Sequence, residues 1–220
     1  MSLSVLVGAG PFEGSDQFYL NWIRQGDLNI AVDGGIKLYH HLNIVPDVFL
    51  GDFDSSQIEE KNWADKKNVP TYSFPCDKDA TDMKLALDYA FSQNITDIIL
   101  LDELGGRLDH SLANIFLLKY AWEKGTPMKI ISPNHIVQLL MPDQSILVEH
   151  RGIISLIIVS EMVTGLHMQG FRWNVSNETV KMGSTLNISN YLIEKQGTIS
   201  IHSGMAFLIF EFTQESFRKI

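Results

Sequence analysis

Residues 48–55 read Val-Phe-Leu-Gly-Asp-Phe-Asp-Ser, an apolar run that leads directly into two aspartates. A second acidic cluster, Asp-Lys-Asp-Ala-Thr-Asp, occupies positions 77–82. Clustered carboxylates repel one another, so a fold that gathers them normally offsets their charge with a cation. Oxygen ligands placed after a strand suit Mg²⁺, which binds substrate phosphates through one or two carboxylates and keeps several waters. The two clusters therefore point to phosphoryl chemistry.

The apolar run at 48–50 is one of several that alternate with helical patterns. Such runs predict strands at 3–7, 29–32, 48–50, 71–74, 97–101 and 128–131. Apolar residues recur at helical spacing over 81–93 and 111–124, and Gly125 is placed to end the second of these helices. Strand–helix alternation predicts an α/β fold with a mainly parallel sheet flanked by helices.

The sequence changes character near residue 134. Short β-rich runs at 137–140, 146–148, 153–159, 198–202 and 206–211 replace the helical patterns, with turn residues between them. They favour an all-β C-terminal unit, a sandwich or a small barrel. We expect two domains, 1–134 and 135–220. The second should pack on the first or on a partner subunit, because roughly 80 residues bury little core alone.

Several polar segments of the first domain should meet at one edge of the sheet. In such sheets ligands bind at the carboxyl ends of the strands. Asp33, Asp52 and the second acidic cluster lie just past predicted strand ends, and so does the Gly-Gly-Arg segment at 105–107. This convergence supports a single active site more strongly than any one motif does.

The acidic motifs also have structural explanations. Asp-x-Asp-Ser at 52–55 could be a polar turn, although the second cluster nearby favours metal binding. Asp82 opens a helix, where a carboxylate suits the positive end of the dipole. Lys78 could contact a phosphate or simply face solvent.

The loop Gly-Gly-Arg-Leu-Asp-His at 105–110 is the second candidate for phosphate contact. Glycines allow close backbone approach, and Arg107 can bind phosphate through two hydrogen bonds. The alternative is a loop with a helix N-cap at Asp109 or Ser111, and His110 could serve either purpose. The chain has no Gly-x-x-x-x-Gly-Lys-Ser/Thr sequence, which disfavours a P-loop kinase.

Composition disfavours several classes of function. A net charge of −9 disfavours nucleic-acid binding, and a protein this acidic needs a local cation to handle anionic substrates. The single cysteine, Cys76, excludes an intrachain disulfide and favours a reducing cytoplasm. No histidine lies near it in sequence, so an incidental thiol is favoured over a reactive one. The N-terminus lacks a secretory-signal pattern, and no apolar run could cross a bilayer, so no membrane partner is expected.

In the β-rich part, Trp173 and the pair Ser189-Asn190 are candidate ligand contacts. An aromatic face can stack on a planar cationic heterocycle, and serine and asparagine can bond to ring nitrogens or an amino group. Core packing for Trp173 and turn formation for the pair explain them equally well.

Taken in order, these motifs resemble the thiamine pyrophosphokinase family over nearly the whole chain. The resemblance rests on Asp33-Gly34-Gly35 and on the segments 51–55, 77–82 and 105–110, with looser matches at Asn134, Gly183 and Ser189-Asn190. The chain departs from the family where Trp173-Asn174 replaces a Tyr-Pro pair and where Tyr191 replaces a glutamate.

The resemblance implies an α/β catalytic domain, a β-sandwich thiamine-binding domain, and a homodimer with active sites between subunits. It implies pyrophosphoryl transfer from ATP to thiamine. The implied roles are Mg²⁺ binding and catalysis by Asp52, Asp54, Asp79 and Asp82, with Arg107 stabilising the transferred group and Asp79 or Asp82 accepting the hydroxyl proton. Implied ATP contacts are Asp33, Asp77, Lys78, Arg107, Asp109, His110 and Asn134, and implied thiamine contacts are Trp173, Ser189 and Asn190.

Two other functions compete with this one. Asp-Phe-Asp-Ser at 52–55 loosely resembles the nucleophile motif of haloacid-dehalogenase phosphohydrolases, although that motif usually lies on the first strand. A non-catalytic sensor of thiamine or nucleotide would keep the same pocket without turnover.

Overall fold

The computed structural model describes residues 1–52, 58–74, 79–149 and 152–212. The chain divides into two compact units, Met1–Pro133 and Asn134–Ile220. Among the predicted site residues, Asp54, Asp77 and Lys78 lie outside the described ranges, as does Cys76.

The first unit contains a parallel sheet of six strands, which confirms the predicted α/β architecture. Its strand order is β6-β5-β1-β2-β3-β4, and every neighbouring pair is parallel. The central strands are apolar along their length because helices cover both faces, and Val5, Leu6 and Val7 of β1 have no exposed surface. The strands are β1 (Leu3–Val7), β2 (Leu28–Val32), β3 (Val48–Gly51), β4 (Thr71–Ser73), β5 (Asp97–Leu101) and β6 (Met128–Ser132).

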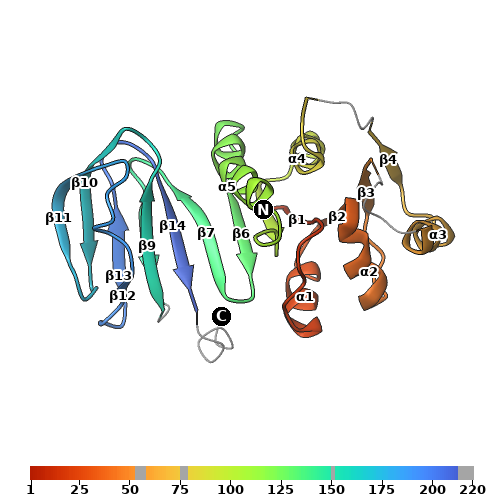
Figure 1. Ribbon diagram of the computed structural model, residues 1–220, viewed down its shortest axis with the longest axis horizontal. Coiled ribbons are helices and arrows are strands. Elements are labelled where there is room, and N and C mark those ends of the chain that lie inside the picture. The colour runs from red at the N-terminus through yellow and green to blue at the C-terminus, as the bar shows by residue number, and fades with distance from the viewer. Residues whose placement is uncertain (53–57, 75–78, 150–151, 213–220) are drawn as a thin grey trace. The chain divides into compact units, whose positions relative to one another are not determined.

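Helices connect these strands on both sides of the sheet. Figure 1 shows α4 and α5 on one side and α1 and α2 on the other. The two predicted helices are present, but α5 begins three residues before the expected start at 111. The helices of the unit are α1 (Asp16–Ile23), the short 3₁₀ helix η1 (Asp33–Gly35), α2 (Ile36–Leu42), α3 (Ile58–Lys66), α4 (Asp82–Ser92) and α5 (Leu108–Glu123).

The strand order reverses at β1, which lies between β2 and β5. After β1 the chain moves outward through β2, β3 and β4, then returns to β5 on the other side of β1. Ligands of open α/β sheets bind at such a reversal, outside the carboxyl ends of the strands. The loops that follow β1, β2, β3 and β5 therefore frame the expected site.

The second unit is built from two antiparallel sheets. Their inward side chains form one core, which includes Ile154 and Leu208 from the first sheet and Met168 and Ile199 from the second. One sheet has the order β12 (Asn190–Tyr191), β9 (Ile153–Ile158), β14 (Ala206–Glu211) and β7 (His135–Leu140). The other has the order β11 (Val175–Lys181), β10 (Met162–Gln169), β13 (Gly197–Ser200) and β8 (Ser145–Val148). This is the predicted all-β sandwich.

Three of these strands are not evident in the sequence: β10, β11 and the two-residue β12. β10 contains Gly165, at which its pairing with β11 shifts register. β11 lies at the edge of its sheet and is exposed over most of its length, so it lacks the alternation that marks a half-buried strand. Within the described residues, no helix is long and apolar enough to span a membrane.

Two acidic residues lie where the strand order reverses, Asp102 buried and Glu103 partly buried. Asp102, directly after β5, is 2% exposed and accepts a hydrogen bond from the Tyr19 hydroxyl of α1. Glu103 points back to the turn after β1, where a Cβ on Gly8 would lie only 2.5 Å from its Oε1. Burial raises the pKa of Glu103 to about 8, with smaller contributions from the charges of Asp102 and Asp33. Hydrogen bonds from the backbone amides of Gly8 and Gly10 lower the pKa of Glu103 and partly offset this rise.

We expect Glu103→Gln to stabilise the protein at high pH. In the unfolded chain this carboxyl loses its proton near its ordinary pKa of 4.5, whereas in the folded protein it does so at about 8. Between these two pKa values the Glu103 carboxyl is charged in the unfolded chain but neutral in the folded protein. The free energy of unfolding therefore falls as pH rises through this range. Thermal melts should show little difference at pH 5 and a melting temperature raised by roughly 5 °C at pH 9. Glu178→Gln, on exposed β11, is the control, and an equal shift at both pH values would contradict the account.

Candidate active site

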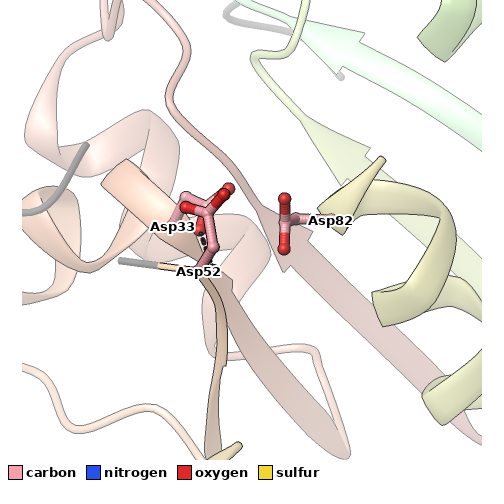
Figure 2. Close-up of side chains that lie close together, drawn as sticks. All are labelled: Asp33, Asp52 and Asp82. Atoms are coloured by element: carbon pink, nitrogen blue, oxygen red, sulfur yellow. Dashed lines mark hydrogen bonds between the residues drawn. The ribbon is translucent and has the colours of Figure 1, made fainter. Parts of the chain in front are cut away.

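Three aspartates from different elements meet at the carboxyl ends of the first unit's strands. Each of Asp33, Asp52 and Asp82 places a carboxylate oxygen within 4.8 Å of the other two. Figure 2 shows the carboxylate of Asp82 facing Asp33 and Asp52 across a short gap. All three side chains are partly exposed, so they can be reached from solvent.

The contact between Asp33 and Asp52 depends on the backbone at two strand ends. Asp33 follows β2 with a φ of +45°, a conformation that costs energy for a residue with a side chain. Its Oδ1 accepts a hydrogen bond of 3.1 Å from the backbone N–H of Asp52. Gly51, with a φ of +154°, makes room for this contact, since a Cβ there would lie 1.8 Å from the same oxygen. Glycine before Asp52 is therefore a steric requirement of the cluster.

Asp82 is held in place by the start of α4. Thr81 is the N-cap of this helix, and its hydroxyl accepts a hydrogen bond from the backbone N–H of Lys84. Asp82 is the first helical residue, where the helix dipole favours a negative charge. The helix packs against β2 and β3, the strands that carry the other two aspartates. The carboxylate of Asp82 therefore lies both at the positive end of the helix dipole and in the acidic cluster. A role at the start of the helix and a role in metal binding are compatible.

This arrangement fits a magnesium site. Mg²⁺ prefers carboxylate oxygens and retains several waters, and it needs open positions for substrate phosphates. Three carboxylates at an exposed sheet edge provide such ligands, and a bound cation would offset their mutual repulsion.

The Gly-Gly-Arg loop follows β5 and leads into α5. Gly105 and Gly106 have φ values of +134° and +68°, which favour glycine. Arg107, not Asp109 or Ser111, is the N-cap residue of α5, and it makes no side-chain capping bond. Arg107 binds Asp109 through Nη2–Oδ2 at 2.6 Å and Nε–Oδ1 at 3.1 Å.

The pair of Arg107 and Asp109 is available to an anionic ligand. Hydrogen bonding between them raises the pKa of Arg107 and lowers that of Asp109, so both stay charged at neutral pH. Their side chains are 72% and 64% exposed, and an ion pair this exposed contributes little stability. A phosphate could therefore displace Asp109 from Arg107 at small cost. His110 lies exposed in the same first turn of α5.

Two further predicted residues lie elsewhere in the described structure. Asp79 is exposed and is not part of the cluster of Asp33, Asp52 and Asp82. Asn134 is exposed at the beginning of the second unit, and its backbone carbonyl accepts a hydrogen bond of 2.7 Å from Phe212.

The predicted thiamine contacts lie together in the second unit. Trp173 is 53% exposed, and its ring meets Tyr191 edge-on with centroids 5.7 Å apart. Asn190 is buried, and its side chain is fully engaged with the backbone. Its Oδ1 accepts from the amides of Trp173 and Tyr191 at 3.2 and 2.9 Å, and its Nδ2 donates to the Trp173 carbonyl at 2.8 Å. Asn190 therefore positions Trp173, while Ser189 beside it is exposed.

Three residues at these sites were not identified from the sequence. Glu103 is a carboxylate just past a strand end, the same signal that identified Asp33 and Asp52. Arg172 gave no such signal, and Tyr191 was noted only as a departure from the family, because their relation to Trp173 arises from the pairing of two distant segments. In that pairing the Arg172 amide donates to the Tyr191 carbonyl at 2.9 Å.

Comparison with known proteins finds one family model in each of the two units. Residues 19–130 match the family model "Thiamin pyrophosphokinase, catalytic domain", and residues 144–206 match "Thiamin pyrophosphokinase, vitamin B1 binding domain". The chain is 33% identical to a thiamine pyrophosphokinase of Bacillus subtilis over 82% of its own length and 85% of the relative's.

Two crystal structures of such proteins are similar throughout. The thiamine pyrophosphokinase of Bacillus subtilis superposes with a TM-score of 0.87 at 30% identity, covering 97% of this chain and 100% of that one. That of Geobacillus thermodenitrificans superposes with a TM-score of 0.83 at 31% identity, covering 98% and 100%. With both family models matched in order along it, the chain belongs to the thiamine pyrophosphokinase family.

Proposed function

We propose that the protein transfers a pyrophosphoryl group from ATP to thiamine, giving AMP and thiamine diphosphate. The observation that carries the proposal is the meeting of Asp33, Asp52 and Asp82 at the sheet edge of a chain that belongs to this family. The thiamine hydroxyl attacks the β-phosphorus of ATP, and AMP is the leaving group. Such transfers depend mainly on positioning and charge stabilisation, which are what this edge of the sheet can supply.

The first unit would bind ATP and the metal. Asp33, Asp52 and Asp82, together with the predicted ligand Asp54, would hold Mg²⁺, which neutralises phosphate charge and aligns the reacting groups. Asp33, predicted as an ATP contact, thus joins the metal ligands. Arg107, released from Asp109, would stabilise charge on the transferred group. The other predicted ATP contacts are retained in this proposal: Asp77, Lys78, Asp109, His110 and Asn134.

A carboxylate outside the metal cluster would accept the thiamine proton. A carboxylate bound to Mg²⁺ is a weaker base, because the cation favours its charged form. Asp79 is exposed, lies three positions before Asp82, and is not a member of the cluster. We assign proton acceptance to Asp79, with alignment of the hydroxyl contributing more than base strength.

The second unit would bind thiamine. The exposed face of Trp173 suits a planar cationic ring, and the Ser189 hydroxyl suits the pyrimidine. Asn190, predicted as a pyrimidine contact, would act by fixing the Trp173 backbone.

We also propose a cytoplasmic homodimer. The second unit exposes Ile153 and Ile157 on β9 and Leu186 and Ile188 on the adjoining segment. Each of these residues is between 40% and 84% exposed. Apolar residues grouped in this way are typical of a subunit interface. Sedimentation equilibrium should give twice the chain mass of 24.8 kDa. A monomer at micromolar concentration would contradict this part of the proposal.

The activity is tested by incubating the protein with ATP, Mg²⁺ and thiamine and separating the products by chromatography. AMP and thiamine diphosphate should appear in equal amounts, and both should depend on thiamine. ADP with thiamine monophosphate would refute the proposed reaction. Phosphate release without thiamine would favour a hydrolase, and binding without any product would favour a sensor.

The metal assignment predicts different defects for neighbouring aspartates. Asp82→Asn should lower kcat on the order of 100-fold or more and weaken Mn²⁺ binding, because it removes one of three clustered carboxylates. Asp79→Asn should lower kcat while leaving Mn²⁺ binding close to wild type. Electron paramagnetic resonance of free Mn²⁺ measures the binding.

The control is Asp65→Asn, an exposed position in α3 remote in sequence from both residues. It should match the wild type in both assays. Unchanged Mn²⁺ binding in Asp82→Asn would refute the role of this residue as a ligand.

A further inference from the structure

Arg172 places its guanidinium over the rings of Trp173 and Tyr191 in the second unit. Its central carbon lies 5.4 Å from the ring centroid of Trp173 and 5.5 Å from that of Tyr191. Its Nη1 donates a 2.6 Å hydrogen bond to the Tyr191 hydroxyl. Among the described residues no carboxylate forms an ion pair with Arg172, so its side-chain partners are these two rings.

Hydrogen bonds with Asn190 hold the backbone that carries the two rings. Asn190 holds the Trp173 backbone at both its N–H and its carbonyl, and the Tyr191 amide donates to the same asparagine. The guanidinium instead ends a long, exposed side chain. A ligand that needs the aromatic faces can therefore displace Arg172 more easily than it can move either ring.

We propose that Arg172 is an affinity-determining residue that competes with the thiazolium ring of thiamine for the aromatic faces. This inference rests on the proposed function, in which thiamine stacks on Trp173. Thiazolium carries a fixed positive charge, and an aromatic face attracts a cation through its quadrupole. A guanidinium on that face both occupies it and repels a second cation. Thiamine must therefore displace Arg172, which weakens its binding.

The expected effect follows from the strength of such contacts. Cation–π contacts at exposed sites are modest, so relief from one or two of them should strengthen thiamine binding roughly three- to tenfold. Repulsion between two exposed cations also weakens with added salt. The competition should therefore appear both in affinity and in its dependence on ionic strength.

The test compares Arg172→Met with the wild type and with Lys181→Met, which removes the same charge from an exposed position on β11. The dissociation constant for thiamine from calorimetry and the KM for thiamine should both fall roughly three- to tenfold in Arg172→Met. They should match the wild type in Lys181→Met. Arg172→Lys, which keeps the charge, should remain near the wild type.

A salt series separates competition from a general structural effect. Raising KCl from 20 to 300 mM should tighten thiamine binding to the wild type but not to Arg172→Met. Weaker or unchanged thiamine binding by Arg172→Met would overturn the inference. Failure of the wild type to form thiamine diphosphate would instead overturn the proposed function, so the two results are distinguishable.

Discussion

The site depends on bringing three carboxylates together at adjacent strand ends. Asp33 adopts a left-handed backbone conformation to direct its side chain toward β3, and Gly51 leaves space for the hydrogen bond to the Asp52 amide. Both features cost conformational energy, and the repulsion among the carboxylates adds to it. A fold retains such an arrangement when a ligand offsets the cost. The parallel sheet, its reversal of strand order at β1 and the start of α4 serve to hold these charges at one exposed edge.

Much of the first unit's fold and of its acidic edge could be predicted from the sequence, because both depend on local patterns. Apolar runs between helical segments predict the six parallel strands, and polar residues just past those runs predict the edge at which Asp33, Asp52 and Asp82 meet. Spacing along the chain cannot separate Asp79 from Asp82. Their difference arises from the N-cap at Thr81, which makes Asp82 the first residue of α4 and leaves Asp79 outside the cluster.

Other features depend on contacts between distant segments and could not be read from any pattern. The raised pKa of Glu103 results from its burial against the turn after β1. Asn190 was predicted as a ligand contact, and only the structure shows that its side chain bonds the backbone of Trp173. Arg172 became informative only through its contacts with Trp173 and Tyr191. In the second unit, therefore, the sequence predicted the segments of interest. The hydrogen bonds then distinguished Asn190, which holds the backbone of a neighbour, from the exposed Trp173 and Ser189.

The central claim is that Asp33, Asp52 and Asp82 hold the catalytic metal. Anomalous diffraction from crystals grown with Mn²⁺ and a non-hydrolysable ATP analogue tests it most directly, because manganese scatters anomalously and carboxylates bind it as they bind Mg²⁺. The account predicts an anomalous peak bonded to oxygens of at least two of these aspartates and to the analogue's phosphates. A peak bonded to the phosphates alone, or none within bonding distance of the three carboxylates, would contradict it.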